Sequence, residues 1–128
     1  MSTVRFVPEL PLADIGTSEN ALLVCDHNTA PLLPAGASSP LVIRADEEHK
    51  SWSTVAKIID AAHRAGLDRN SCITALGGGV LCDVVAFAAS VYLRGVRLVL
   101  IPTTLVAMVD AALGGKTGVD YESRKNLI

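Results

Sequence analysis

The chain has 128 residues, half of them hydrophobic, and a formal net charge of −2 at pH 7. This length and apolar content are enough for one domain with a buried core. The near-neutral charge excludes the basic excess of a nucleic-acid-binding protein and the charged, weakly hydrophobic composition of a disordered chain.

Features that would direct the chain to a membrane or out of the cell are missing from the pattern. The first ten residues lack a basic patch followed by an apolar core, so we expect no signal peptide. The most apolar stretch, 84–93, lies between Asp83 and Arg94 and is too short to span a bilayer. Three cysteines without a CxxC spacing indicate reduced thiols, so we expect a cytoplasmic protein.

The first half of the chain alternates predicted strands and helices. Residues 21–26 form an apolar run that ends at the polar cluster 26–28, as a buried strand does when it enters a functional loop. Three prolines make 31–40 irregular, and 41–44 is a second strand. Apolar residues recur at helical spacing over 52–65, with Ser51 as the expected N-cap and Gly66 as the stop.

The second half repeats this alternation. We predict a strand over 71–76, a buried helix over 80–93, a strand over 96–101 and a helix over 103–113 that ends at two glycines. Strands and helices of these lengths imply an α/β fold with flanking helices on a mostly parallel sheet. Ligands of such sheets bind beyond the carboxyl ends of the strands, where the polar clusters lie.

A glycine turn, Gly77-Gly78-Gly79, lies between a strand and a helix. Such a turn lets the backbone approach a pyrophosphate, which the N–H groups of the helix then bind. The dinucleotide pattern GxGxxG is met only in part, because Cys82 occupies the third glycine position. The alternative is a tight turn without a ligand, in which Asp83 stabilises the helix dipole instead of accepting hydrogen bonds from a ribose.

A second glycine-rich stretch, Gly115-Lys116-Thr117, is not a Walker A loop. The pattern requires a glycine where Asp110 stands, and it requires a strand where we predict a helix. Taken alone, Lys116 is most simply a solvated loop lysine.

Residues 75–128 read ALGGGVLCDVVAFAASVYLRGVRLVLIPTTLVAMVDAALGGKTGVDYESRKNLI. This stretch resembles the 3-dehydroquinate synthases, whose motifs read GGGVxGDxxGFAAxxYxRG, VPTTLLxxVDxxxGGKTGxN and GKNxIG. The resemblance implies a Rossmann-like, NAD-binding domain over 1–128 and places the chain at the N-terminal side of a two-domain enzyme. It also implies that the zinc ligands, a glutamate and two histidines, lie after residue 128, so we assign no metal to the three histidines present.

The resemblance implies two sets of contacts. NAD is expected to meet Asp26, Asn28, Glu47, Lys50, Gly77, Gly78, Gly79, Asp83, Thr103, Thr104, Lys116 and Lys125. The sugar-phosphate substrate is expected to meet Arg94, Asp110, Lys116 and Asn126, of which Lys116 and Asp110 are also the expected catalytic residues. The family's counterpart of Arg94 reaches the neighbouring subunit's site, which implies a homodimer.

The chain departs from the family pattern at four positions. Cys82 and Ala86 replace glycines, which are small-for-small changes, whereas Asp120 and Arg124 alter charge beside the substrate site. The expected activity is the conversion of 3-deoxy-arabino-heptulosonate 7-phosphate to 3-dehydroquinate in the shikimate pathway, with NAD and a divalent metal, zinc or cobalt. The alternatives are another sugar phosphate cyclase that makes a cyclitol, and a non-catalytic NAD-binding or dimerisation module. The 128 residues alone are expected to be inactive.

Overall fold

The structure is a computed structural model that describes residues 3, 5, 20–35, 37 and 39–128. The segment in which we excluded a signal peptide therefore lies mostly outside the described residues, as do two positions of the irregular stretch 31–40. No helix in the described part of the chain has the length and apolarity needed to cross a membrane.

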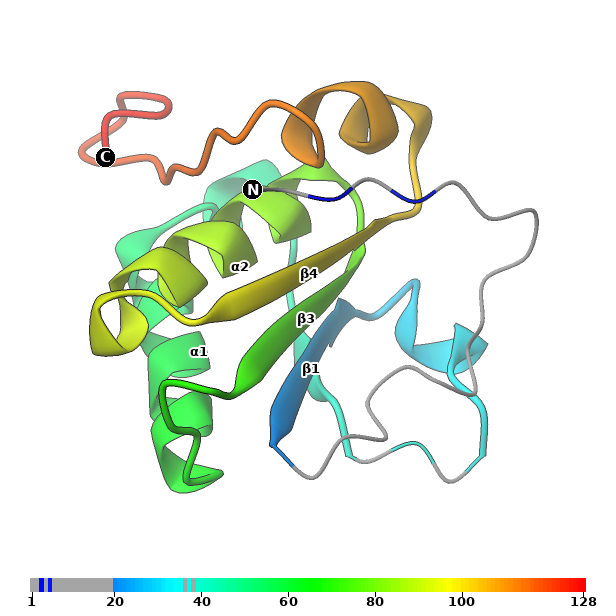
Figure 1. Ribbon diagram of the computed structural model, residues 1–128. Helices are drawn as coiled ribbons and strands as arrows, with labels where there is room; N and C mark the ends of the chain where they lie inside the picture. The colour runs from blue at the N-terminus through cyan, green and yellow to red at the C-terminus, as the bar shows by residue number, and fades with distance from the viewer. Residues whose placement is uncertain (1–2, 4, 6–19, 36, 38) are drawn as a thin grey trace.

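Four parallel strands form one sheet in the order β2-β1-β3-β4. The strands are β1 (Ala21–Asp26), β2 (Leu41–Ile43), β3 (Cys72–Gly77) and β4 (Arg97–Pro102). Each lies within two residues of its predicted bounds, and β1 and β3 read as continuous apolar runs because they are the central strands. All four carboxyl ends meet at one edge of the sheet, which we call the carboxyl edge (Figure 1).

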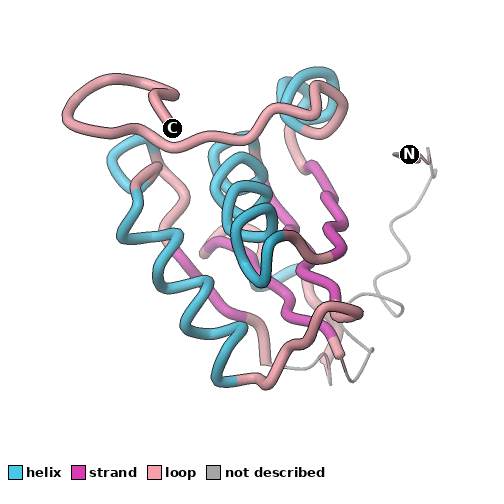
Figure 2. Tube along the Cα trace, turned by 60° about the vertical axis from the view of Figure 1, so that its left-hand side comes forward, coloured by secondary structure: helices cyan, strands magenta, loops and turns pink. Residues whose placement is uncertain are grey.

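Helices α1 (Trp52–Arg64) and α2 (Gly79–Val91) lie side by side on one face of the sheet (Figures 1 and 2). The main core lies between them and the strands, and it includes Val55, Ile58, Val84 and Val85, all less than 2% exposed. The α/β prediction is therefore confirmed, including the central helix that is apolar on most sides.

Gly66 ends α1 as predicted. It has φ +69°, its N–H donates to the carbonyl of His63, and the N–H of Leu67 donates to that of Ala62. These two bonds are the Schellman pattern, which needs a left-handed residue and therefore favours glycine. Ser51 precedes the helix as predicted, but its side chain bonds other hydroxyls instead of capping the backbone.

The opposite face of the sheet has a smaller core. Leu23, Cys25 and Leu76 pack there against Ala30 and Leu33, which follow β1. The described part of the β1–β2 connection holds one short 3-10 turn, η2 (Ala30–Leu32), where a parallel crossover usually has a longer helix. The two faces are thus covered very differently by the described residues.

The predicted helix over 103–113 is wrong in extent and in kind. Strand β4 runs through Pro102, the helical turn begins only at Leu105, and Ala107–Ala111 is a π-helix, η5. The widened turn is visible in the bond from the N–H of Ala112 to the carbonyl of Ala107. Likewise, α2 ends at Val91 instead of residue 93, and the 3-10 turn η4 (Tyr92–Arg94) follows it.

Candidate functional site at the carboxyl edge

The turn after β1 presents Asp26 at the carboxyl edge. One carboxylate oxygen, Oδ1, accepts bonds from the N–H groups of Asn28 (2.8 Å) and Thr29 (2.9 Å). Thr29 is 5% exposed, and its hydroxyl donates to the carbonyl of Leu76 at 2.8 Å, which ties this turn to β3. The other oxygen, Oδ2, faces Gly77 across the edge.

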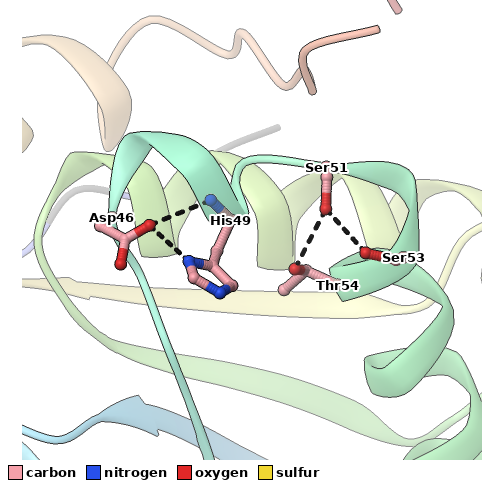
Figure 3. A network of polar contacts seen from close by, with 5 residues as sticks. All are labelled: Asp46, His49, Ser51, Ser53 and Thr54. Carbon is pink, nitrogen blue, oxygen red and sulfur yellow. Dashed lines mark hydrogen bonds and ion pairs between the residues drawn. The ribbon is translucent and has the colours of Figure 1, made fainter.

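The segment after β2 forms a second polar turn, η3 (Glu47–His49), between two small networks (Figure 3). Asp46 caps it by accepting bonds from the backbone N–H and the ring Nδ1 of His49. These bonds hold the pKa of the Asp46 carboxyl below its usual value. On the other side, the hydroxyl of Ser51 bonds those of Ser53 and Thr54, which fixes the entry into α1.

The glycine turn has different steric demands at its ends. A Cβ on Gly77 would lie 2.4 Å from Cδ2 of Leu81, so any side chain there would displace that leucine. A Cβ on Gly79 would meet no atom of the described residues within 4 Å, so these residues leave the space in front of it open. The first backbone bond of α2 runs from Cys82 N–H to Gly78 carbonyl, 3.0 Å, which leaves the three preceding N–H groups without helical partners.

Lys50 and Asp83 form an ion pair across the site. Lys50 Nζ lies 2.7 Å from Asp83 Oδ2 and 2.6 Å from Asn126 Oδ1, and the lysine is 6% exposed. Asp83 lies in the second turn of α2, so its partner is this ammonium group instead of the helix dipole. A second pair, Lys125–Glu47 at 2.9 Å, is exposed, and it raises the pKa of the Lys125 amine.

The residues after β4 close the site on one side. The N–H of Thr103 donates to the carbonyl of Gly77 at 2.9 Å, and Thr104 caps the next helical turn by accepting from the N–H of Ala107 at 3.3 Å. Asp110 and Lys116 both approach Gly114, since a Cβ there would lie 3.7 Å from Asp110 Oδ1 and from Lys116 Cγ. The two expected catalytic side chains are thus neighbours, and both residues are exposed.

Arg94 lies at the other end of the sheet. It precedes β4, so it is beside the amino ends of the strands, and the whole length of α2 separates it from the glycine turn. Leu93 (φ +50°) and Arg94 (φ +69°) are both left-handed, which is strained for side-chain-bearing residues. The structure therefore does not bring Arg94 together with the other expected site residues of the same chain.

Two residues that support the site were missed as such by sequence reasoning. Thr29 orders the Asp26 turn, and Asp120, noted only as a charge change, accepts the N–H of Asn126 at 2.8 Å through Oδ1. The N–H of Asp120 donates to the carbonyl of Lys50 at 2.8 Å. A threonine three residues after an aspartate is a turn signal that could have revealed the first. The role of Asp120 depends on its contact with Lys50, which is distant in the sequence.

Two cavities open near β2. The smaller, about 220 Å³, lies at the carboxyl edge and is lined by Asp26, Asn28 and Asp46 among others. The larger, about 430 Å³, runs between β2 and α1 and includes none of the expected cofactor or substrate residues. The smaller cavity is therefore the one that belongs to this site. In the described part of the chain, no three His, Cys, Asp or Glu side chains cluster in a way that could hold a metal ion.

The chain matches a known family and known structures. Residues 40–128 match the family model described as 3-dehydroquinate synthase N-terminal. The 3-dehydroquinate synthase of Synechococcus sp. (strain CC9605) is 57% identical over 88 residues, 69% of this chain and 24% of the relative. That of Prochlorococcus marinus (strain MIT 9303) gives the same values. The chain thus spans about a quarter of the length of the curated relatives it matches.

Solved structures show the same fold. The 2-epi-5-epi-valiolone synthase of Streptomyces hygroscopicus subsp. jinggangensis 5008, solved with NAD+ and Zn2+, has a TM-score of 0.78 and 34% identity. The match covers 100% of this chain and 41% of that one. A 2-deoxy-scyllo-inosose synthase, complexed with carbaglucose-6-phosphate, NAD+ and Co2+, has a TM-score of 0.73 and 28% identity, with 87% of this chain and 34% of that one covered.

Proposed function

The chain belongs to the 3-dehydroquinate synthase family, and from this premise we propose that it forms the NAD-binding part of such an enzyme. The observation that carries the proposal is the open start of α2. The described residues leave the space in front of Gly79 open, and the first N–H groups of the helix have no helical acceptors. A pyrophosphate fits this arrangement, because it needs close backbone approach and donors at a helix N-terminus.

The other groups at the carboxyl edge suit the rest of the cofactor. Among the described residues, no donor bonds Asp26 Oδ2, and a carboxylate beside the glycine turn can accept bonds from ribose hydroxyls. Asn28 and Glu47 flank the same edge. When bound, NAD supplies the hydride acceptor and donor for a secondary alcohol, while the protein supplies binding and orientation.

We propose that the substrate is 3-deoxy-arabino-heptulosonate 7-phosphate, which this family converts to 3-dehydroquinate with loss of phosphate. Lys116 and Lys125 provide positive charge for its anionic groups. Asp110, beside Lys116 at Gly114, and Asn126 provide hydrogen bonds to its hydroxyls. We place this activity in the cytoplasm and in the shikimate pathway, and we expect zinc or cobalt as the metal of the complete enzyme. We assign no metal ligand to the described residues.

We also propose a homodimer. The basis is the position of Arg94, which lies at the amino end of the sheet and cannot serve the site of its own chain. A guanidinium suits bidentate contact with a phosphate, and a second subunit would bring it to the neighbouring site. Sedimentation of the wild-type chain and of Arg94→Ala tests the dimer. Turnover of mixtures of Arg94→Ala and Lys116→Ala subunits tests the shared site, on protein that includes the remaining family length and with added zinc. Restored turnover in the mixture is the expected result.

Gly79 offers a clean test of NAD binding. Because a Cβ at Gly79 meets no atom of the described residues within 4 Å, Gly79→Ala and Gly79→Phe should leave the melting temperature nearly unchanged. Calorimetry should show progressively weaker NAD binding as the side chain grows into the pyrophosphate position. Equal affinity in wild type and Gly79→Phe would contradict the proposal.

A second candidate is a cyclase that makes a cyclitol, since both solved neighbours above are of that kind. The 57% identity to 3-dehydroquinate synthases exceeds the 34% and 28% to those neighbours, which favours the first candidate. Product analysis with the heptulosonate phosphate and with sugar phosphates, on protein that includes the remaining family length and added zinc, separates the two. Phosphate release from neither substrate would favour a non-catalytic module.

A further inference from the structure

Lys50 joins two parts of the site that are far apart in the sequence. Its ammonium group donates to Asp83 on α2 and to Asn126 near the end of the chain. The Lys50 side chain is 7% exposed, against 71% for Lys125 in the other ion pair of this region. Water therefore competes much less for the Lys50 contacts than for the Lys125 contact.

Residues 119–128, here called the terminal loop, are bonded to one another and contact the rest of the described chain at few points. Backbone bonds join Val119 to Ile128 and Tyr121 to Arg124, and these close the loop on itself. Val119 is fully buried in the main core and anchors one end. Within the described part of the chain, three polar contacts join the loop to the body of the protein: Asp120 N–H to the Lys50 carbonyl, Lys50 Nζ to Asn126, and Lys125 to Glu47.

Lys50 therefore holds the terminal loop through its main chain and through its side chain. Asn126 has φ +52°, a conformation that asparagine tolerates better than most residues, and its N–H is bound by Asp120. Its amide oxygen is thereby fixed at 2.6 Å from Lys50 Nζ. A largely buried ammonium group needs hydrogen-bond acceptors. Loss of either Asp83 or Asn126 as an acceptor would therefore leave the Lys50 ammonium group incompletely bonded, which costs free energy.

We propose that Lys50 is a positioning residue that couples the cofactor side of the site to the substrate side. By holding Asp83 and Asn126 together, it makes the order of the terminal loop depend on the occupancy of the glycine turn. Only the dependence of loop order on NAD rests on the proposed function. The attachment of the loop through Lys50 is a property of the protein without ligand, so the two can fail separately.

The first test uses hydrogen exchange of the 128-residue chain without ligand. Asn126→Gly removes the acceptor and keeps the left-handed backbone accessible, and we expect amides of 120–126 to exchange about tenfold faster. Asn126→Asp keeps an acceptor oxygen, so its amides should be as well protected from exchange as those of wild type. Ser123→Gly, at another left-handed position of the loop, is the matched control and should not accelerate exchange. Equal protection in Asn126→Gly and wild type would overturn the attachment.

The second test adds NAD. In wild type and Asn126→Asp, NAD should slow exchange of 120–126 further, because fixing Asp83 also fixes Lys50. In Asn126→Gly, calorimetry should still detect NAD binding, but the further slowing should be lost. Slowing of equal size in Asn126→Gly would overturn the coupling. Failure of NAD to bind wild type would instead contradict the proposed function and leave the ligand-free result to decide the role of Lys50.

Discussion

The sheet with its two helices and the segment after it are held together by different forces. Between β1 and β4, burial dominates, and the core residues of α1 and α2 are almost completely inaccessible. From residue 103 onward, Ala107 and Val119 are the buried hydrophobic anchors, while Leu105 is 76% and Val109 is 65% exposed. Polar contacts to Gly77, Glu47 and Lys50 also attach this segment. The first region is therefore specified by composition and periodicity, and the second by contacts with residues that are distant in the sequence.

The sharpest way to test this contrast is a matched pair of leucine substitutions. Leu81→Ala removes a fully buried side chain and should lower the free energy of unfolding by about 2–5 kcal/mol. Leu105→Ala removes a side chain that is 76% exposed and should change it by less than about 0.5 kcal/mol. Urea denaturation measures both. Similar losses would mean that Leu105 is covered in solution and that the contrast is wrong.

A steric prediction concerns Gly77, where the glycine turn meets the core. Gly77→Ala places a methyl group 2.4 Å from Cδ2 of Leu81 and should destabilise the fold by about 1–3 kcal/mol. In Leu81→Ala, the same substitution should cost clearly less, because the obstructing atom is gone. A double-mutant cycle in urea checks this, and additive losses would contradict the steric explanation.

Alkaline pH should weaken the buried region through Cys82. Burial, reinforced by neighbouring Asp83, raises the pKa of this thiol from its ordinary 9.0 to about 11. Between these values the unfolded chain loses the proton before the folded chain does, so stability falls as pH rises from about 9 to about 11. Urea midpoints measured at both ends of this pH window give the loss of stability, which should be smaller in Cys82→Ala than in wild type. An unchanged loss would exclude Cys82 as a source.

The smallest effect is expected in the terminal loop. Glu122 and Ser123 are both left-handed between the paired residues Tyr121 and Arg124, as in a type I′ turn. Ser123→Gly relieves this strain, and we expect a gain in stability of at most about 1 kcal/mol. A small rise in melting temperature supports the expectation. A fall would show that the hydroxyl of Ser123 has a partner in solution.

Sequence reasoning predicted the buried region well and the later segment poorly, for physical reasons. Apolar runs and a helical repeat are local, so the strands and α1 could be located, and Gly66 was correctly predicted to end α1. The predicted helix over 103–113 was wrong in extent and kind: the helical turn begins at Leu105 and widens into a π-helix over Ala107–Ala111, and the apolar pattern did not reveal this local geometry.

The contacts of the site lie beyond local patterns. The Lys50–Asp83 pair spans 33 positions and the Lys50–Asn126 contact spans 76. Family resemblance could name these residues, but it could not show that they touch one another. That requires knowing how the segment after β2, the start of α2 and the terminal loop converge at the carboxyl edge.

Helix α2 also fixes the distance and the rotation between the glycine turn at its start and Arg94 beyond its end. Its 13 residues rise about 1.5 Å each, so the glycine turn and the corner at Arg94 are separated by about 20 Å along the axis. Each residue also turns the helix by about 100°, so inserting a single residue would rotate the corner away from its present direction while the strand register stayed fixed. Insertions and deletions within 79–91 should consequently be tolerated far less than substitutions at its two exposed residues, Ser90 and Val91. A shift of a whole turn, three or four residues, should be the least harmful change of length.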